Sequence, residues 1–276
     1  MVGIAVAVGV SAGTATGQLW VGRQWRVVVP DQEYSAGTDT WPFQLVLLVW
    51  CAASAAALGA ACARPILGEV WWRYAAVVPA GVGALAPLEM ATSWAAGAGL
   101  SADPVAGATK AMLVGALVGA CIGVTVLVRP AAARCLAVWV GFVWLCVAGE
   151  VALDDPVRPG ESVVPAHPLG LLTPSLEAED TEWLVGLLPP VLLAAVLGWW
   201  VARRGERWPL YAAVVGPLLM IAVHAAVPPL PGGDSDGDHY LLRSDLMAWV
   251  LVTALGAGVA ALGALVGRRW SGRDKT

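Results

Sequence analysis

The sequence repeats part of itself once, at an offset of 137 to 139 residues, inside a run of strongly apolar segments. The five residues from Tyr74 to Val78 (YAAVV) recur unchanged from Tyr211 to Val215. Two further matches keep the same order: Leu58, Gly59, Ala63 and Arg64 recur as Leu197, Gly198, Ala202 and Arg203, and Leu113, Val114, Ala116 and Leu117 recur as Leu251, Val252, Ala254 and Leu255. A shared offset is typical of a duplicated unit. We therefore expect two similar halves, residues 1–134 and 135–276.

The apolar segments have the length and composition of membrane-spanning helices. Mean hydropathy is +0.72 and only 13% of the residues are charged, which excludes an ordinary soluble domain. A helix needs about 20 apolar residues to cross the bilayer core. Eight segments meet this requirement: Val2–Val21, Pro42–Ala63, Tyr74–Gly97, Val105–Val128, Cys135–Leu153, Trp183–Val201, Pro209–Val227 and Leu246–Val266.

The loops between these segments alternate in charge. One set carries eleven basic residues, namely Arg64, Arg73, Arg129, Arg134, Arg203, Arg204, Arg207, Arg268, Arg269, Arg273 and Lys275. The other set carries fifteen of the twenty acidic residues. Basic loops face the cytoplasm, so we expect a multi-pass protein of a bacterial plasma membrane with both termini cytoplasmic. The lipid bilayer is its predicted partner, together with a second membrane protein or another copy of this chain, and no nucleic acid.

The predicted fold is therefore an all-α integral membrane protein with eight transmembrane helices in two parallel four-helix repeats. An even number of helices per repeat inserts both halves in the same direction, so they are related by an axis along the membrane normal. Small residues recur at every fourth position, as Ala5, Gly9, Gly13 and Gly17 in the first segment and as Gly115, Gly119 and Gly123 in the fourth. Such stripes let helix backbones approach closely in a membrane, so we expect both to be packing seams.

Few ionisable residues lie within the apolar segments, and each is a candidate functional residue because a charge in the bilayer is unfavourable. They are Glu89, Lys110, Glu150 and His224, all in the predicted outer half. We expect Glu89 to face the bundle interior and to pair with Lys110, since their segments form a hairpin. Two interpretations of Glu89 remain: a merely paired carboxylate, and a proton-transfer or substrate-binding group in an outward-facing cavity.

Prolines occur inside three of the segments. Pro79 and Pro87 precede Glu89, and Pro189, Pro190 and Pro217 occupy the second half. Each proline removes a backbone donor and frees a carbonyl one turn earlier, which favours a local helix break. In an outer loop, Asp234, Asp236, Asp238 and Asp245 have the spacing of calcium ligands, although His239 stands where a calcium loop has glycine. A solvated acidic loop is the alternative.

Three functions fit these features. The first is a small transporter or permease component with a polar site around Glu89. The second is a membrane enzyme on a lipid-like or isoprenoid substrate: Pro87-Leu88-Glu89 resembles the proline-x-acidic motif of membrane lycopene cyclases, although the second half has Pro217-Leu218-Leu219. The third is a non-catalytic membrane scaffold. The sequence has no phosphate loop, nucleophile elbow, HExxH or CxxC motif, so we expect no cofactor, no ATP hydrolysis and no classical protease chemistry.

Overall fold

The computed structural model describes residues 1–29, 41–98, 103–153, 182–206, 208–227 and 250–262, and all regular structure among them is helical. The side chains of residues 42, 43, 150, 153 and 182–187 lie outside this description. The helices are α1 (Val2–Gln24), α2 (Trp41–Ala63), α3 (Val70–Ala75), α4 (Val77–Ala84), α5 (Leu88–Ala95), α6 (Pro104–Val128), α7 (Pro130–Leu153), α8 (Glu182–Arg203) and α9 (Pro209–Ala225). A further helix covers Val250–Leu262.

Five helical stretches in the described part of the chain are long and apolar enough to cross a membrane. They are Val2–Gln24, Gln44–Ala63, Val70–Ala95, Pro104–Val128 and Pro130–Gly149. Shorter apolar helices follow at Leu188–Arg203, Pro209–Ala225 and Val250–Leu262. Large apolar side chains cover much of the exterior, including Val78 and Leu145, which are each 70% exposed. Lengths and an exterior of this kind are compatible with a polytopic membrane protein.

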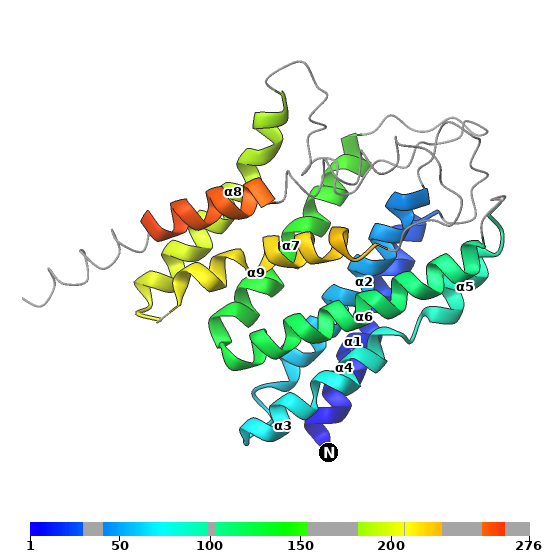
Figure 1. Cartoon of the computed structure of the whole chain (residues 1–276), viewed down its shortest axis with the longest axis horizontal. Coiled ribbons are helices and arrows are strands. Elements are labelled where there is room, and N and C mark those ends of the chain that lie inside the picture. Colours follow the sequence, from blue (N-terminus) through cyan, green and yellow to red (C-terminus); the bar gives the residue numbers. More distant parts are fainter. Residues whose placement is uncertain (30–40, 99–102, 154–181, 207, 228–249, 263–276) are drawn as a thin grey trace, which may run out of the picture.

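Helix α2 is the centre of the first half of the molecule. It packs against α1, α4 and α6, while α9 packs against α7 and α8. Figure 1 shows α1 to α6 gathered toward one end, α8 and the helix 250–262 side by side toward the other, and α7 and α9 between them. Most of the contacts that join the two groups run from α2 and α6 to α7 and α9.

The third apolar segment is broken twice, as its prolines predict. Helix α3 ends at Ala75, four residues before Pro79, and α4 ends at Ala84, three residues before Pro87. A proline removes its own backbone donor and its ring collides with the carbonyl four residues earlier, so the helix stops there. Tighter bonds between residues three apart, such as Ala86 N–H to the Gly83 carbonyl, fill the second break. By contrast, α8 and α9 continue through their internal prolines.

The glycine stripe of α6 is a packing seam, as expected. A Cβ atom on Gly119 would lie 2.2 Å from the carbonyl oxygen of Ala53 in α2, and one on Gly115 would lie 2.5 Å from that of Val49. Only glycine lets the backbones of α2 and α6 approach this closely.

The corresponding expectation for α1 is wrong within this chain, because Gly9, Gly13 and Gly17 have open space around them. Helix α1 instead buries the face with Ala7, Ser11, Ala15 and Gln18. On that face the hydroxyl of Ser11 donates to the carbonyl of Ala55 at 3.1 Å. A polar side chain in an apolar environment needs a partner, and this requirement turns α1 so that Ser11 and Gln18 point inward.

Candidate functional site

Glu89 does not face the bundle interior, so this expectation is wrong. It lies in the first turn of α5, just after the break at Pro87, and its side chain is exposed. Lys110 on α6 is exposed as well. In the part of the chain that the structure describes, no ion pair joins the two. Helix α5 buries the small residues Ala91 and Ala95, and its close packing on α6 leaves the long charged side chains on the outside.

The other sequence candidates do not form a cluster with Glu89. His224 in α9 is 5% exposed, and its Nδ1 lies 2.8 Å from the Met220 carbonyl. Because a carbonyl only accepts, this nitrogen carries the donated proton. The side chain of Glu150 in α7, and Asp234, Asp236, Asp238 and Asp245, lie outside the described residues. Among the described residues, no group of three His, Cys, Asp or Glu side chains is placed to hold a metal ion.

A polar cluster that the sequence analysis missed lies inside the bundle, where α1, α2 and α7 meet. The side-chain amide of Gln18 donates to the Ser54 hydroxyl at 3.1 Å, and the Trp144 indole N–H donates to the Gln18 carbonyl oxygen at 3.0 Å. Ser54 is fully buried and Gln18 is 8% exposed. We call these three residues the polar joint, because they connect α1 and α2 with α7. A sequence signal existed: Ser11 and Gln18 lie two helical turns apart on one face of α1.

Aromatic and amide side chains also surround the C-terminal end of α1, close to Gln18. The Trp144 ring packs edge-on against Trp25, with ring centres 6.1 Å apart. Gln44 of α2 donates to the Val27 carbonyl at 3.2 Å and accepts from the Val29 N–H at 3.0 Å. The segment that follows α1 is therefore fixed on α2, beside the polar joint.

A second site lies at the end of the bundle where Arg64, Arg129, Arg134 and Arg204 gather, which we call the arginine-rich end. Here the turn between α6 and α7 meets the turn between α8 and α9, and we call these two turns the corners. Arg129 and Trp208 each precede a proline, and these prolines begin α7 and α9. The ring of a proline forces the residue before it out of helical geometry. Both residues are accordingly non-helical: Arg129 is extended, with φ of −130° and ψ of 109°, and Trp208 has φ of −134° and ψ of 58°. Their side chains meet: the Arg129 guanidinium carbon lies 4.3 Å from the centre of the Trp208 ring.

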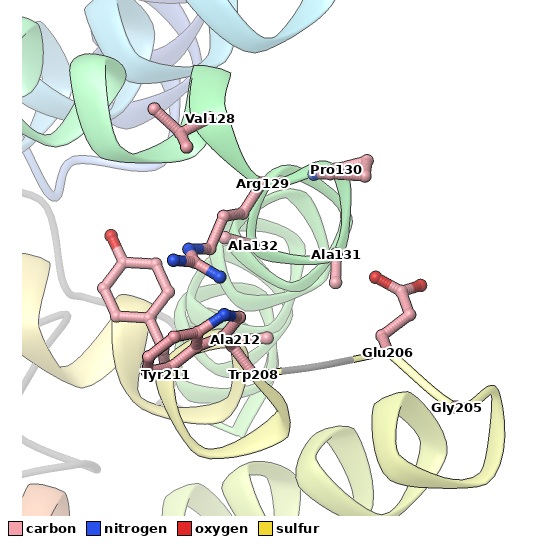
Figure 2. A pocket seen from close by; sticks show the side chains of 10 residues that line it. All are labelled: Val128, Arg129, Pro130, Ala131, Ala132, Gly205, Glu206, Trp208, Tyr211 and Ala212. Carbon is pink, nitrogen blue, oxygen red and sulfur yellow. The ribbon is translucent and has the colours of Figure 1, made fainter.

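The two corners enclose a pocket of about 410 Å³, which we call the corner pocket. Residues 128–132 line one wall, and the opposite wall is lined by Gly205, Glu206, Trp208, Tyr211 and Ala212. Figure 2 shows the Arg129 guanidinium over the Trp208 indole and beside the Tyr211 ring, with Glu206 on the other side of the pocket. The Arg129 guanidinium, the Tyr211 ring and the first turns of α7 and α9 therefore all border the corner pocket.

The surroundings of the corner pocket are strongly positive. Arg134 pairs with Glu206, which is the one acidic side chain in the pocket lining. Arg134 and Arg204 both lie over the Trp200 ring, at 5.2 and 4.3 Å from its centre. Nearby, the Arg64 Nε donates to the Leu127 carbonyl at 2.9 Å, at the end of α6. Partial burial lowers the pKa of Arg64, and repulsion by Arg73 and Arg134 lowers it further, so positive charge exceeds negative charge here.

Comparisons of the sequence and structure with protein-family models, curated proteins and solved structures find no match. A functional proposal therefore rests on the chemistry of the residues themselves. Two sites in the described residues carry such chemistry: the polar joint inside the bundle and the corner pocket at its arginine-rich end. Neither of them includes Glu89.

Proposed function

We propose that this chain is a small transporter or permease component of a bacterial plasma membrane. The observation that carries the proposal is the polar joint. Gln18, Ser54 and Trp144 place amide, hydroxyl and indole groups inside an otherwise apolar bundle, between the helices of the first half and those of the second. Transporters bind their substrates at the interface of their repeats, where polar groups replace water around the substrate.

The interrupted third segment supports the same function. Discontinuous helices are a recurrent feature of transporter binding sites, because a break frees backbone carbonyls inside the membrane. Helix α4, which ends at such a break, packs against α1, α2 and α6. The substrate-facing polar group of this proposal is Gln18 on α1, in place of Glu89.

The pattern of helix contacts is consistent with a duplicated four-helix unit. The first and third segments of each half contact each other, as α1 with α4 and α7 with α9. The second and fourth segments do so as well: α2 packs on α6, and a Cβ atom on Gly198 of α8 would lie 2.4 Å from Ala260. In this proposal both units cross the membrane in the same direction. The arginine-rich end with the corner pocket then faces the cytoplasm, and Gln18 lies in the outer half.

The accessibility of Ser54 to water tests the transport proposal. A transport path opens the polar joint to water during part of each cycle, so a cysteine in place of Ser54 becomes reactive to a charged, membrane-impermeant maleimide. The variant S54C is made with the five native cysteines replaced by alanine, and the labelling rate is measured in right-side-out and inside-out vesicles. We expect labelling at least about tenfold faster than that of Cys51 in a matched control.

The control retains Cys51 as its only thiol. Cys51 is fully buried one turn away on α2, so it reports any general loosening of this helix. If the cysteine at position 54 reacts as slowly as Cys51 from both sides, the joint is closed to water. The transport proposal then fails.

A further inference from the structure

We infer that the corner pocket binds a phosphate group, carried either by an anionic lipid headgroup or by a small soluble phosphate. This inference does not depend on the transport proposal, because the corner pocket and the polar joint share no residue. It rests on the arrangement of Arg129, Tyr211 and the starts of α7 and α9 around one open space.

Arg129 is held in an orientation that suits phosphate. The Trp208 ring covers one face of its guanidinium group at 4.3 Å, an attractive contact that fixes the plane of the group. The N–H donors of a guanidinium lie in that plane and point away from its edges, so stacking leaves them available. Two parallel N–H donors match two oxygens of a phosphate.

Further donors line the same pocket. Tyr211 lies beside Arg129 (Figure 2), and no hydrogen bond to its hydroxyl occurs within the described part of the chain. The first turns of α7 and α9 contribute residues 130–132, Tyr211 and Ala212 to the lining. Pro130 has no N–H and the Ala212 N–H is bonded to the Trp208 carbonyl, so the backbone donors among them are the N–H groups of Ala131, Ala132 and Tyr211. The first N–H groups of a helix have no partner within it, and they carry the positive end of the helix dipole. These groups add to the positive field of Arg129.

The acidic residue of the pocket does not oppose this assignment. Glu206 pairs with Arg134, so its charge is compensated. Figure 2 shows its carboxylate on the side of the pocket opposite Tyr211. An anion beside Arg129 and Tyr211 therefore has an arginine, a hydroxyl and two helix starts close to it, and the one carboxylate is already neutralised.

The pocket opens beside apolar surface. Its volume of about 410 Å³ lies in the range of small-molecule sites, about 300 to 1,000 Å³, and leaves room for the group that carries the phosphate. Val128 and Trp208 at its edge are 52% and 56% exposed. Apolar side chains next to a phosphate site suit a lipid, whose acyl chains continue along the protein.

Two binding measurements with matched variants test the inference. In the first arm, wild-type protein in nanodiscs of phosphatidylcholine with a fraction of phosphatidylglycerol is examined by native mass spectrometry for retained phosphatidylglycerol. In the second arm, inorganic phosphate is titrated against protein in neutral detergent at constant ionic strength, and the melting temperature is recorded. The variants are R129Q and Y211F. The control is R203Q, because Arg203 stacks on Trp199 at 5.3 Å outside the pocket.

In at least one arm, we expect R129Q to bind about tenfold more weakly than wild type, and Y211F about threefold more weakly, since each loses hydrogen bonds to the anion. R203Q should match wild type. An effect with phosphatidylglycerol alone identifies a lipid headgroup, whereas an effect with phosphate as well identifies a site for soluble anions. If R129Q is poorly folded by size-exclusion chromatography, Y211F decides. Binding by R129Q and Y211F equal to that of R203Q in both arms overturns the inference.

Discussion

Replacing Gly119 with leucine will strongly destabilise the protein. The substituted Cβ would lie 2.2 Å from the Ala53 carbonyl oxygen and 2.7 Å from the Ala53 Cα. These are backbone atoms of α2, so no side-chain rotation relieves the collision and the two helices must separate. Because α2 also holds α1 and α4, we expect a loss of about 3 kcal/mol or more.

The measurement is thermal unfolding in detergent, followed by the fluorescence of the fifteen tryptophans. A loss of this size lowers the melting temperature by about 6 to 12 °C in a chain of this length. The matched control is G13L on α1, because a Cβ atom on Gly13 meets nothing within 4 Å. We expect G13L to unfold within about 2 °C of wild type. Equal melting temperatures for the two variants would show that α2 and α6 do not pack along this stripe.

Replacing Gln18 with leucine will also produce a large loss of stability. Leucine fills a similar volume but offers no acceptor to the Trp144 N–H and no partner to the buried Ser54 hydroxyl. A polar group left buried without a partner costs about 1 to 3 kcal/mol. This applies in full to the Trp144 N–H, whereas the Ser54 hydroxyl keeps its 3.4 Å bond to the Cys51 carbonyl, so we expect a total of about 2 to 4 kcal/mol. Gln24, exposed at the end of the same helix, provides the control Q24L, with an expected change below about 0.5 kcal/mol.

A double-mutant cycle with W144F separates the free energy of the hydrogen bond between Gln18 and Trp144 from the contribution of general packing. If the Trp144 bond to Gln18 contributes as described, Q18L and W144F together cost less than the sum of their separate effects, by about 0.5 to 1.5 kcal/mol. Strict additivity of the two changes would mean that Gln18 and Trp144 do not interact. The transport proposal would then lose the observation that carries it.

The pattern of small residues predicted which residues share a helix face, but not the direction of that face. Gly115 and Gly119 meet α2 as expected, whereas Gly9 and Gly13 point outward. The stripes of α6 and α1 have the same four-residue spacing, so the spacing alone does not show which of them contacts another helix. The orientation of α1 is decided by Ser11 and Gln18, whose polar groups need partners on α2 and α7. Attention to polar residues in an apolar helix would have identified the buried face.

For the candidate sites as well, the sequence gives the position of a residue along its helix but not the direction in which it points. The sequence places Glu89 after a proline break, and the structure agrees on this point. The side of α5 that carries Glu89 depends on which residues pack against α6, and these are Ala91 and Ala95. Arg129 and Trp208 are 79 positions apart. Each has a local signal, the proline that follows it, but their contact arises only when the two corners come together.

The most direct test of the membrane arrangement is the sidedness of two loop positions, both outside the described residues. In a cysteine-free background, S235C and S271C are exposed to a membrane-impermeant thiol reagent in intact cells and again after permeabilisation. The proposed topology, with the acidic loops outside and both termini in the cytoplasm, predicts that S235C is labelled in intact cells and S271C only after permeabilisation. The reverse pattern, or labelling of both positions in intact cells, would contradict it.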